Sequence, residues 1–319
     1  MTSDVVSELV AAACRGELRA TARLATFFED TRAQTADRRE EALNGLRAFS
    51  DGAGNGLRAF RGPGVVLGIT GSPGAGKSSL ISALMPLLME RSDARVAVIA
   101  VDPSSTLSGG SLLGDRTRMS TESERTFFRS QAAASTLGGL AETTFEVCRA
   151  LEHLFDLILV ETVGVGQSES AVRALASRLY LVMQPGAGDR VQHMKAGIIE
   201  LPDVFVMNKC DLEGGATSAG ALRASLRLGS SPGARVIDTS ARTGTGVAEL
   251  CDDVLSAVRS GGPGCVAAEP AFFRAWVERT YGRVGLDSLG SRPNFMETAG
   301  GYDAGKRSFG VELLAGSLR

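Results

Sequence analysis

Lysine is scarce in this chain of 319 residues, because only four of its 34 basic residues are lysine and the rest are arginine. The four are Lys77, Lys195, Lys209 and Lys306. Where an arginine-rich chain keeps a lysine, we expect a site that needs a compact point charge with three hydrogen-bond donors. Codon bias is the simpler alternative, and it predicts that the lysines fall without regard to any motif.

The chain also has few histidines, and it lacks closely paired cysteines and long apolar runs. The two histidines and five scattered cysteines include no C-x-x-C pair, which argues against a structural zinc site and favours reduced thiols. Apolar runs such as Val96–Val101 are far too short to cross a bilayer. No basic stretch followed by an apolar one opens the chain, so we expect a cytoplasmic protein without a signal peptide or membrane anchor.

The charges nearly cancel, since 34 basic and 36 acidic residues leave a net charge of −2. This balance argues against partners bound through bulk positive charge, so we expect neither nucleic acid nor a membrane surface as a partner. Apolar residues make up 44% of the chain, which is enough for the large core of a globular protein.

The first part of the chain has the composition of a helical extension and a linker. Apolar residues at three- and four-residue intervals predict helices over residues 1–50. A Gly-rich linker over 51–64 follows. The hexapeptide Asn-Gly-Leu-Arg-Ala-Phe occurs at 44–49 and again at 55–60, and we assign no function to this duplication.

Residues 65–262 show short apolar runs that alternate with longer amphipathic segments. Continuous apolar runs separated by helices are typical of parallel strands buried on both faces, so we expect an α/β domain with a mostly parallel, doubly wound sheet. Ligands bind at the carboxyl ends of the strands in such sheets. The runs are Val65–Thr70, Arg95–Val101, Phe155–Glu161, Arg178–Met183, Val204–Met207 and Arg235–Asp238.

Residues 263–319 lack this alternation and form a C-terminal extension. Its pattern predicts one helix around Phe272–Tyr281 and another near Ala304–Ala315. We expect an appendage too small to fold independently.

The sequence Gly71-Ser-Pro-Gly-Ala-Gly-Lys77-Ser78 directly follows the first apolar run and fits the phosphate-loop pattern G-x-x-x-x-G-K-[ST]. Its glycines let backbone N–H groups turn toward phosphate oxygens, Lys77 reaches the β- and γ-phosphates, and the Ser78 hydroxyl can bind Mg²⁺. The nucleotide-binding residues expected here are Gly71, Ser72, Gly74, Ala75, Gly76, Lys77, Ser78 and Ser79.

Asn208-Lys209-Cys210-Asp211 follows the run Val204–Met207 and fits the guanine-reading pattern N-K-x-D. The carboxylate of Asp211 can accept from both N1–H and the 2-amino group of guanine, whereas adenine has no such 2-amino donor. The aliphatic stem of Lys209 can cover the base. Ser240, Ala241 and Arg242 follow the next run as a third base-contacting loop. The sequence therefore predicts binding of GTP and GDP rather than adenine nucleotides.

Glu161 closes the run Phe155–Glu161, at the place where phosphate-loop NTPases carry the carboxylate associated with magnesium. Asp102 and Asp115 are further acids in polar segments after strands. Because Mg²⁺ keeps several water ligands, three carboxylates could hold it largely through water. A solvated loop acid is an equally good interpretation of Asp115.

Val165 follows Gly164, so the water-orienting Gln that Ras-like GTPases carry directly after this glycine is absent. Gln167 comes three positions after Gly164, and its identity alone does not give it that role. We therefore expect slow intrinsic hydrolysis that a partner or a second loop accelerates. The stretch Pro185–Lys195 is a candidate for that loop, and the scarcity of lysine favours a function for Lys195.

Together these stretches resemble one family, the bacterial MeaB and human MMAA-type G-protein chaperones of adenosylcobalamin-dependent acyl-CoA mutases, some of whose homologues are labelled ArgK-type transport ATPases. The resemblance runs from the helical segment Leu9–Glu29 through Gly246-Val-Ala-Glu-Leu. Its most specific stretches are Val101-Asp-Pro-Ser-Ser, Gly109-Gly-Ser-Leu-Leu-Gly-Asp-Arg-Thr-Arg-Met, Thr136-Leu-Gly-Gly-Leu-Ala, Glu161-Thr-Val-Gly-Val-Gly-Gln-Ser-Glu169 and Pro185-Gly-Ala-Gly-Asp189.

The resemblance implies a phosphate-loop NTPase fold of the SIMIBI branch, which contains the signal-recognition and metal GTPases, with a GTPase domain over 65–262 and a dimerising C-terminal extension over 263–319. It implies catalytic roles for Lys77, Glu161 and Lys195. The implied magnesium environment is Ser78, Asp102, Asp115 and Glu161. The implied switch residues are Val163, Gly164, Val165, Gly166, Gln167, Gly186, Asp189 and Lys195. Two departures are Ser79, where Thr is common, and Cys210 at the variable position of the guanine motif.

The implied activity is that of a homodimeric GTPase that gates adenosylcobalamin loading, protection and reactivation of an acyl-CoA mutase, without binding cobalamin itself. A metal-delivery GTPase of the hydrogenase or urease maturation type is the main alternative, but it needs Cys and His ligands, and the chain has only His153 and His193 and no paired cysteines. A transport kinase or ATPase conflicts with Asn208 and Asp211. A structural clamp with incidental GTPase activity is a third alternative.

Overall fold

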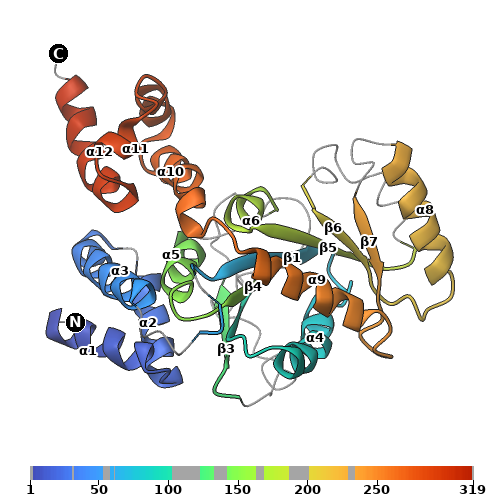
Figure 1. Ribbon diagram of the computed structural model, residues 1–319. Helices are drawn as coiled ribbons and strands as arrows, with labels where there is room; N and C mark the ends of the chain where they lie inside the picture. Colours follow the sequence, from blue (N-terminus) through green and yellow to red (C-terminus); the bar gives the residue numbers. More distant parts are fainter. Residues whose placement is uncertain are drawn as a thin grey trace.

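The computed structural model describes residues 3–30, 32–52, 58–60, 62–102, 123–132, 142–162, 169–186, 201–228 and 234–317 (Figure 1). At its centre lies a seven-stranded sheet of order β3-β2-β4-β1-β5-β6-β7, and all pairings among these strands are parallel. The strands are β1 (Val65–Gly71), β2 (Val96–Asp102), β3 (Thr126–Ala132), β4 (Leu157–Thr162), β5 (Arg178–Met183), β6 (Val204–Met207) and β7 (Arg235–Asp238).

The parallel sheet predicted from the apolar runs is confirmed, but β3 is a strand that the sequence reading missed. Its sequence, Thr-Phe-Phe-Arg-Ser-Gln-Ala, is not a continuous apolar run. The reason is its place at the edge of the sheet, where Arg129 and Gln131 both donate to the carboxylate of Glu29 in the N-terminal extension. An edge strand needs polar side chains that a central strand could not bury.

Helices cover both faces of the sheet, with α4 (Lys77–Arg91) and α9 (Val247–Ser260) on one face and α5 (Glu142–Leu151) and α6 (Glu169–Leu175) on the other (Figure 1). Alternate side chains of the central strands supply the two cores, because successive residues of a strand point to opposite faces. Leu67 and Leu159 belong to the core under α4 and α9, whereas Val66 and Ile158 belong to the core under α5 and α6. A smaller core joins β5, β6 and α8 (Gly215–Leu228).

The N-terminal extension packs its helices against α5. Within the extension α1 contacts α2 and α3, and both α2 and α3 contact α5. Leu24, Phe28 and Leu46 are fully buried and share one continuous apolar core with Phe145 of α5. The elements are α1 (Ser3–Cys14), α2 (Leu18–Glu29), the short 3-10 turn η1 (Ala33–Thr35) and α3 (Ala36–Asp51).

The C-terminal extension is more structured than its sequence pattern predicts. It comprises η3 (Cys265–Ala268), α10 (Glu269–Gly290), α11 (Phe295–Thr298) and α12 (Tyr302–Ser317), and α10 is interrupted at Gly282, where φ is 59°. An aromatic core holds these helices together, and Phe272 stacks on Phe145 of α5 with ring centroids 4.1 Å apart. Nowhere in the described parts of the chain is a helix long and apolar enough to cross a bilayer.

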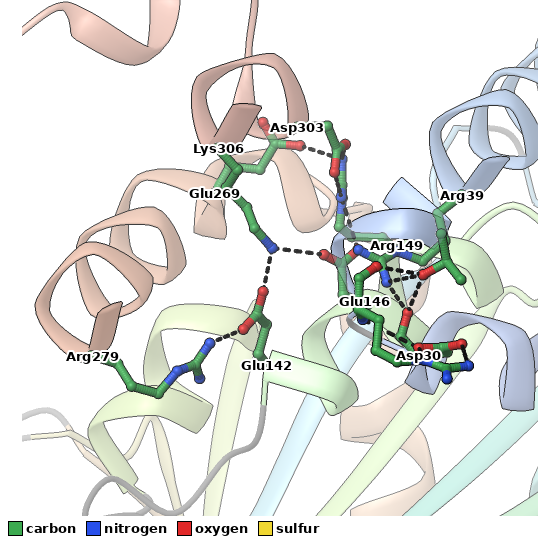
Figure 2. Close-up of polar contacts among 11 residues, drawn as sticks. Asp30, Arg39, Glu142, Glu146, Arg149, Glu269, Arg279, Asp303 and Lys306 are labelled. Atoms are coloured by element: carbon green, nitrogen blue, oxygen red, sulfur yellow. Dashed lines mark hydrogen bonds and ion pairs between the residues drawn. The ribbon is translucent and has the colours of Figure 1, made fainter. Parts of the chain in front are cut away.

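A buried ionic cluster joins α5 to α10 and α12. Its members are Glu146, Arg149, Glu269 and Asp303, here named the Arg149 cluster (Figure 2). The guanidinium of Arg149 lies 2.9 Å from Glu146, 3.2 Å from Glu269 and 2.7 Å from Asp303. Burial lowers the pKa of Arg149, but the surrounding carboxylates outweigh this effect and the pKa is raised. The guanidinium is therefore firmly charged.

Lys306, the lysine without a role in any sequence motif, belongs to the border of this cluster. Its ammonium group pairs with Glu142 of α5 and lies 3.9 Å from Glu146. Arg279 of α10 pairs with Glu142 as well (Figure 2). The fully buried Arg39 of α3 adds positive charge beside Glu146 and Asp303. The N-terminal and C-terminal extensions therefore meet at α5.

Replacing the central cation should strongly destabilise the protein. We expect Arg149→Met to lower the free energy of unfolding at pH 7 by about 3 to 5 kcal/mol, because three carboxylates would lose their partner in a buried site. Urea unfolding checks this value. The matched control is Arg91→Met, whose ion pair with Asp252 has the same 2.7 Å separation but is solvent-exposed, and we expect it to cost under about 1 kcal/mol. Equal losses in the two variants would contradict the importance of the cluster.

The second prediction concerns His153, a buried imidazole whose Nδ1 lies 3.0 Å from the Ser50 hydroxyl. Burial, and then the charges of Arg47, Arg58 and Arg149, lower the pKa of His153 to about 4. The unfolded chain, with an ordinary histidine pKa of about 6.5, therefore binds this proton first as the pH falls. Stability due to the neutral imidazole is fully present above pH 6.5 and is lost toward pH 4, by up to about 1.4 kcal/mol per pH unit.

The measurement is urea unfolding of the native protein and of His153→Gln at pH 7, 6 and 5. The carboxylates titrate in both proteins, so the difference between the two profiles isolates the imidazole. We expect the native protein to lose stability more steeply than the variant over this range. Parallel profiles would show that His153 titrates normally in the folded state.

Candidate functional site

The phosphate loop lies between the end of β1 and the start of α4, at the carboxyl edge of the sheet. Two of its glycines are required by the geometry. Gly71 has a φ of 144°, and a Cβ there would lie 2.1 Å from the carbonyl oxygen of Val182. Gly76 has a φ of 88°, and a Cβ there would lie 2.5 Å from the side-chain amide of Asn208. The loop can therefore lie this close to Val182 and Asn208 only with glycine at these two positions.

Lys77 is the first residue of α4, and its side chain folds back over the loop. Its Nζ donates to the carbonyl oxygens of Gly71 at 2.8 Å and of Ser72 at 3.2 Å. Burial lowers the pKa of Lys77, and the opposing attraction of Glu161 only partly restores it. Two carbonyl oxygens of the loop therefore hold this ammonium group against the loop.

Ser78 and Glu161 form the second polar pair of the site. The Ser78 hydroxyl donates to Oε1 of Glu161 at 2.6 Å, and Glu161 is buried near the end of β4. Strand β4 lies between β1 and β2, so Glu161 pairs in register with Ile69 and Ala100. Hydroxyl and carboxylate oxygens are the ligands that Mg²⁺ prefers, so the pair fits that ion chemically.

The remaining residues of the predicted magnesium environment are only partly described. Asp102 ends β2, the strand next to β4, and nothing is described of its side chain. Asp115 lies outside the described residues. Within the described residues, no group of three or more His, Cys, Asp or Glu side chains is placed to hold a metal ion.

Asn208 connects the phosphate loop to the loop after β7. Its Nδ2 donates to the carbonyl oxygen of Ala75 at 2.9 Å, and its Oδ1 accepts from the backbone N–H of Ala241 at 3.1 Å. Both partners are among the residues that the sequence assigns to nucleotide binding. A single amide thus connects the loop that is predicted to bind phosphate with the loop that is predicted to bind the base.

Asp211 and Lys209 complete the base end. Both oxygens of the Asp211 carboxylate are engaged, one by the Ser240 hydroxyl and the other by the guanidinium of Arg242, each at 2.6 Å. The hydrogen bond from Ser240 is the largest cause that holds the pKa of Asp211 below its usual range, and the backbone N–H of Asp211 and then the charge of Arg242 act in the same direction. The group is therefore an ionised double acceptor at neutral pH, as recognition of guanine requires.

Lys209 has the one positive φ, 59°, among the described non-glycine residues. Its Nζ donates to the side-chain oxygen of Gln184 at 2.8 Å. Gln184 belongs to none of the predicted motifs, but it directly follows β5, and residues just after a strand of a parallel sheet are candidates for ligand binding. Gln184 positions the lysine whose stem the sequence assigns to the face of the base.

The predicted switch residues are mostly outside the described part of the chain. This holds for Val163, Gly164, Val165, Gly166 and Gln167, and also for Asp189 and Lys195. Gly186 is described, and its φ is 77°. Ser79, at the start of α4, completes the described set of predicted nucleotide-binding residues.

Comparison with solved structures supports the fold. The crystal structure of an LAO/AO transport system kinase has a TM-score of 0.65 to this chain, covers 94% of it and 90% of its own length, and is 22% identical in sequence. At this identity the similarity shows the fold alone.

Comparison of the sequence with those of known proteins shows more than the fold. A Mycobacterium tuberculosis protein named as a probable GTPase is 41% identical over 261 residues, which make up 79% of this chain and 74% of that protein. The mouse protein named methylmalonic aciduria type A homolog, mitochondrial, is 41% identical over 196 residues, 58% of this chain and 47% of its own. The family model of the methylmalonyl-CoA mutase-associated GTPase MeaB matches residues 21–261. The chain is therefore a GTP-hydrolysing enzyme and belongs to the MeaB family of mutase-associated GTPases.

Proposed function

We propose that this GTPase gates the loading, protection and reactivation of adenosylcobalamin in a B12-dependent acyl-CoA mutase, either methylmalonyl-CoA mutase or a relative of it. The observation that carries the proposal is the match of residues 21–261 to a family described as associated with methylmalonyl-CoA mutase. The mouse relative, named for methylmalonic aciduria, supports it. Family membership favours this function over metal delivery for hydrogenase or urease maturation.

At the phosphate end, Lys77 neutralises the β- and γ-phosphates while backbone N–H groups of the loop donate to their oxygens. Ser78 and Glu161, with Asp102 and Asp115, would hold Mg²⁺, which when bound neutralises charge on the phosphate oxygens. The hydrogen bond from Ser78 to Glu161 holds the hydroxyl and carboxylate oxygens 2.6 Å apart. Lys195 completes the proposed catalytic group.

At the base end, Asp211 accepts from the two adjacent donors of guanine, and Ser240 fixes the carboxylate in place. Asn208, Ala241 and Arg242 line the same end of the site. Since Asn208 also binds the phosphate loop, a base seated on Asp211 delivers its phosphates to Lys77.

The switch in this proposal comprises Val163–Glu169 and Gly186–Lys195. GTP and GDP differ by the γ-phosphate, and only the γ-phosphate together with Mg²⁺ can hold both Glu161 and the backbone near Gly164. A mutase that binds these segments distinguishes the two nucleotides and receives or releases its cofactor accordingly. The GTPase works in the cytoplasm as a homodimer through residues 263–319 and needs no contact with cobalamin itself.

Asp211→Asn tests the assignment of guanine recognition. The amide of the variant would face the 2-amino group of guanine donor to donor, so we expect GDP affinity to fall by about a hundredfold or more. Xanthosine diphosphate, which presents an oxygen at that position, should gain affinity. Equilibrium titration with both nucleotides measures the reversal. Asp252→Asn, at an exposed position, is the matched control, and a variant Asp211→Asn that kept its preference for GDP would contradict the assignment.

Addition of a purified acyl-CoA mutase, with methylmalonyl-CoA mutase tested first, checks the proposed function itself. We expect the mutase to accelerate GTP hydrolysis and the bound nucleotide to change the rate of adenosylcobalamin transfer into the mutase. In Lys195→Ala, GDP should bind with native affinity while the stimulated rate of hydrolysis drops.

The control for this experiment is Arg259→Ala, which removes an exposed cation at the end of α9. Mutase addition should stimulate that variant as it does the native protein. The proposal fails if neither the hydrolysis rate nor cofactor transfer responds to the partner and the nucleotide.

A further inference from the structure

Two buried threonines, here named the threonine pair, lie at the carboxyl ends of the two central strands. The Thr162 hydroxyl of β4 donates to the Thr70 hydroxyl of β1 at 3.1 Å, and both residues are only 1% exposed. Val66 and Val160, which point to the same face of these strands, belong to the apolar core under α5 and α6. Loss of one hydroxyl would therefore leave the other without this partner at the end of an apolar layer.

The threonine pair lies just beyond the point where the backbone pairing of β1 with β4 ends. In the part of the chain that the structure describes, this ladder runs as far as Ile69 opposite Glu161 and no further. Strand β1 then continues beside β5 through Gly71, while β4 continues beside β2. Beyond the ladder, the hydrogen bond of the threonine pair still connects the two strand ends.

Each of these strand ends carries one part of the nucleotide site. The phosphate loop begins with Gly71, directly after Thr70, and Glu161 directly precedes Thr162. Because successive residues of a strand point to opposite faces, Glu161 points toward α4, where Ser78 donates to it, and Thr162 points away from α4. Two hydrogen bonds thus connect the β1 side with the β4 side, one on each face of the sheet.

We propose that the threonine pair positions Glu161 relative to the phosphate loop for magnesium binding. This inference rests on the proposed function, because it takes Ser78 and Glu161 as residues that would hold Mg²⁺. Both threonines point away from Ser78, so the pair acts through Glu161 and not as a ligand. Without the pair, the two strand ends occupy the binding arrangement for a smaller fraction of the time, and the apparent affinity for the ion falls by that fraction.

The experiment measures GDP affinity by equilibrium titration over a series of Mg²⁺ concentrations, in the native protein and in Thr162→Val. Valine has nearly the shape of threonine but lacks the hydroxyl. Since one hydrogen bond is lost, we expect Thr162→Val to need about two- to tenfold more Mg²⁺ for the half-maximal gain in GDP affinity. Thr162→Ser keeps a hydroxyl and should restore the native requirement.

The matched control is Thr144→Val. It removes a fully buried hydroxyl of α5 that has no hydrogen-bond partner among the described residues. We expect this variant to need the same Mg²⁺ concentration as the native protein.

A double variant, Thr70→Val with Thr162→Val, separates positioning from stability. Thr162→Val alone leaves the Thr70 hydroxyl buried without its partner, so urea unfolding should show a loss of stability. The double variant removes both hydroxyls and should recover much of that loss. Its Mg²⁺ requirement should nevertheless stay raised, because the connection between the strand ends is still missing. If Thr162→Val does not fold, the double variant provides the test.

A native Mg²⁺ requirement in the double variant would overturn the inference, because an unpaired hydroxyl would then explain any effect of Thr162→Val. An equal shift in Thr144→Val, or no recovery in Thr162→Ser, would also overturn it. The proposed function fails by other results, namely if Mg²⁺ does not change the GDP affinity of the native protein or if the mutase experiment gives no response.

Discussion

Arg149 lies among three carboxylates that come from α5, α10 and α12, and the guanidinium and Glu146 are almost completely removed from solvent. All three carboxylates must stay paired with this buried cation, because an unpaired buried carboxylate would carry its full desolvation cost. The position of the C-terminal helices relative to α5 is therefore set by charge as well as by the stacking of Phe145 on Phe272. Since the N-terminal helices share the core under α5, one helix determines how both extensions meet the sheet.

Asn208 has a comparable organising position within the nucleotide site. It binds Ala75 in the phosphate loop and Ala241 in the base loop, and it is buried beside Gly76. Its own place is given by the end of β6, which pairs with both β5 and β7. The sheet thus brings together residues that are more than 160 positions apart in the chain, and the amide locks them at one separation.

Much of this arrangement could be predicted from the sequence, because the six apolar runs and the motifs after them are local signals. The residue patterns of the phosphate loop and of Asn208–Asp211, together with their places after apolar runs, predict these parts of the site, and the sheet order brings them to one edge. Strand β3 escaped prediction because its polar residues serve an edge contact with α2. The ion-pair partners of Lys306 and Arg242 could not be predicted either, because an ion pair between distant segments leaves no periodic pattern in the sequence.

Both edges of the sheet carry arginine bound to a neighbouring helix. On β3, Arg129 binds Glu29 of α2, and on the four-residue β7, Arg235 binds Glu249 and Asp253 of α9. Charged side chains on an edge strand disfavour the pairing of a further strand with it. The arrangement therefore works against growth of the sheet by strand addition at both edges.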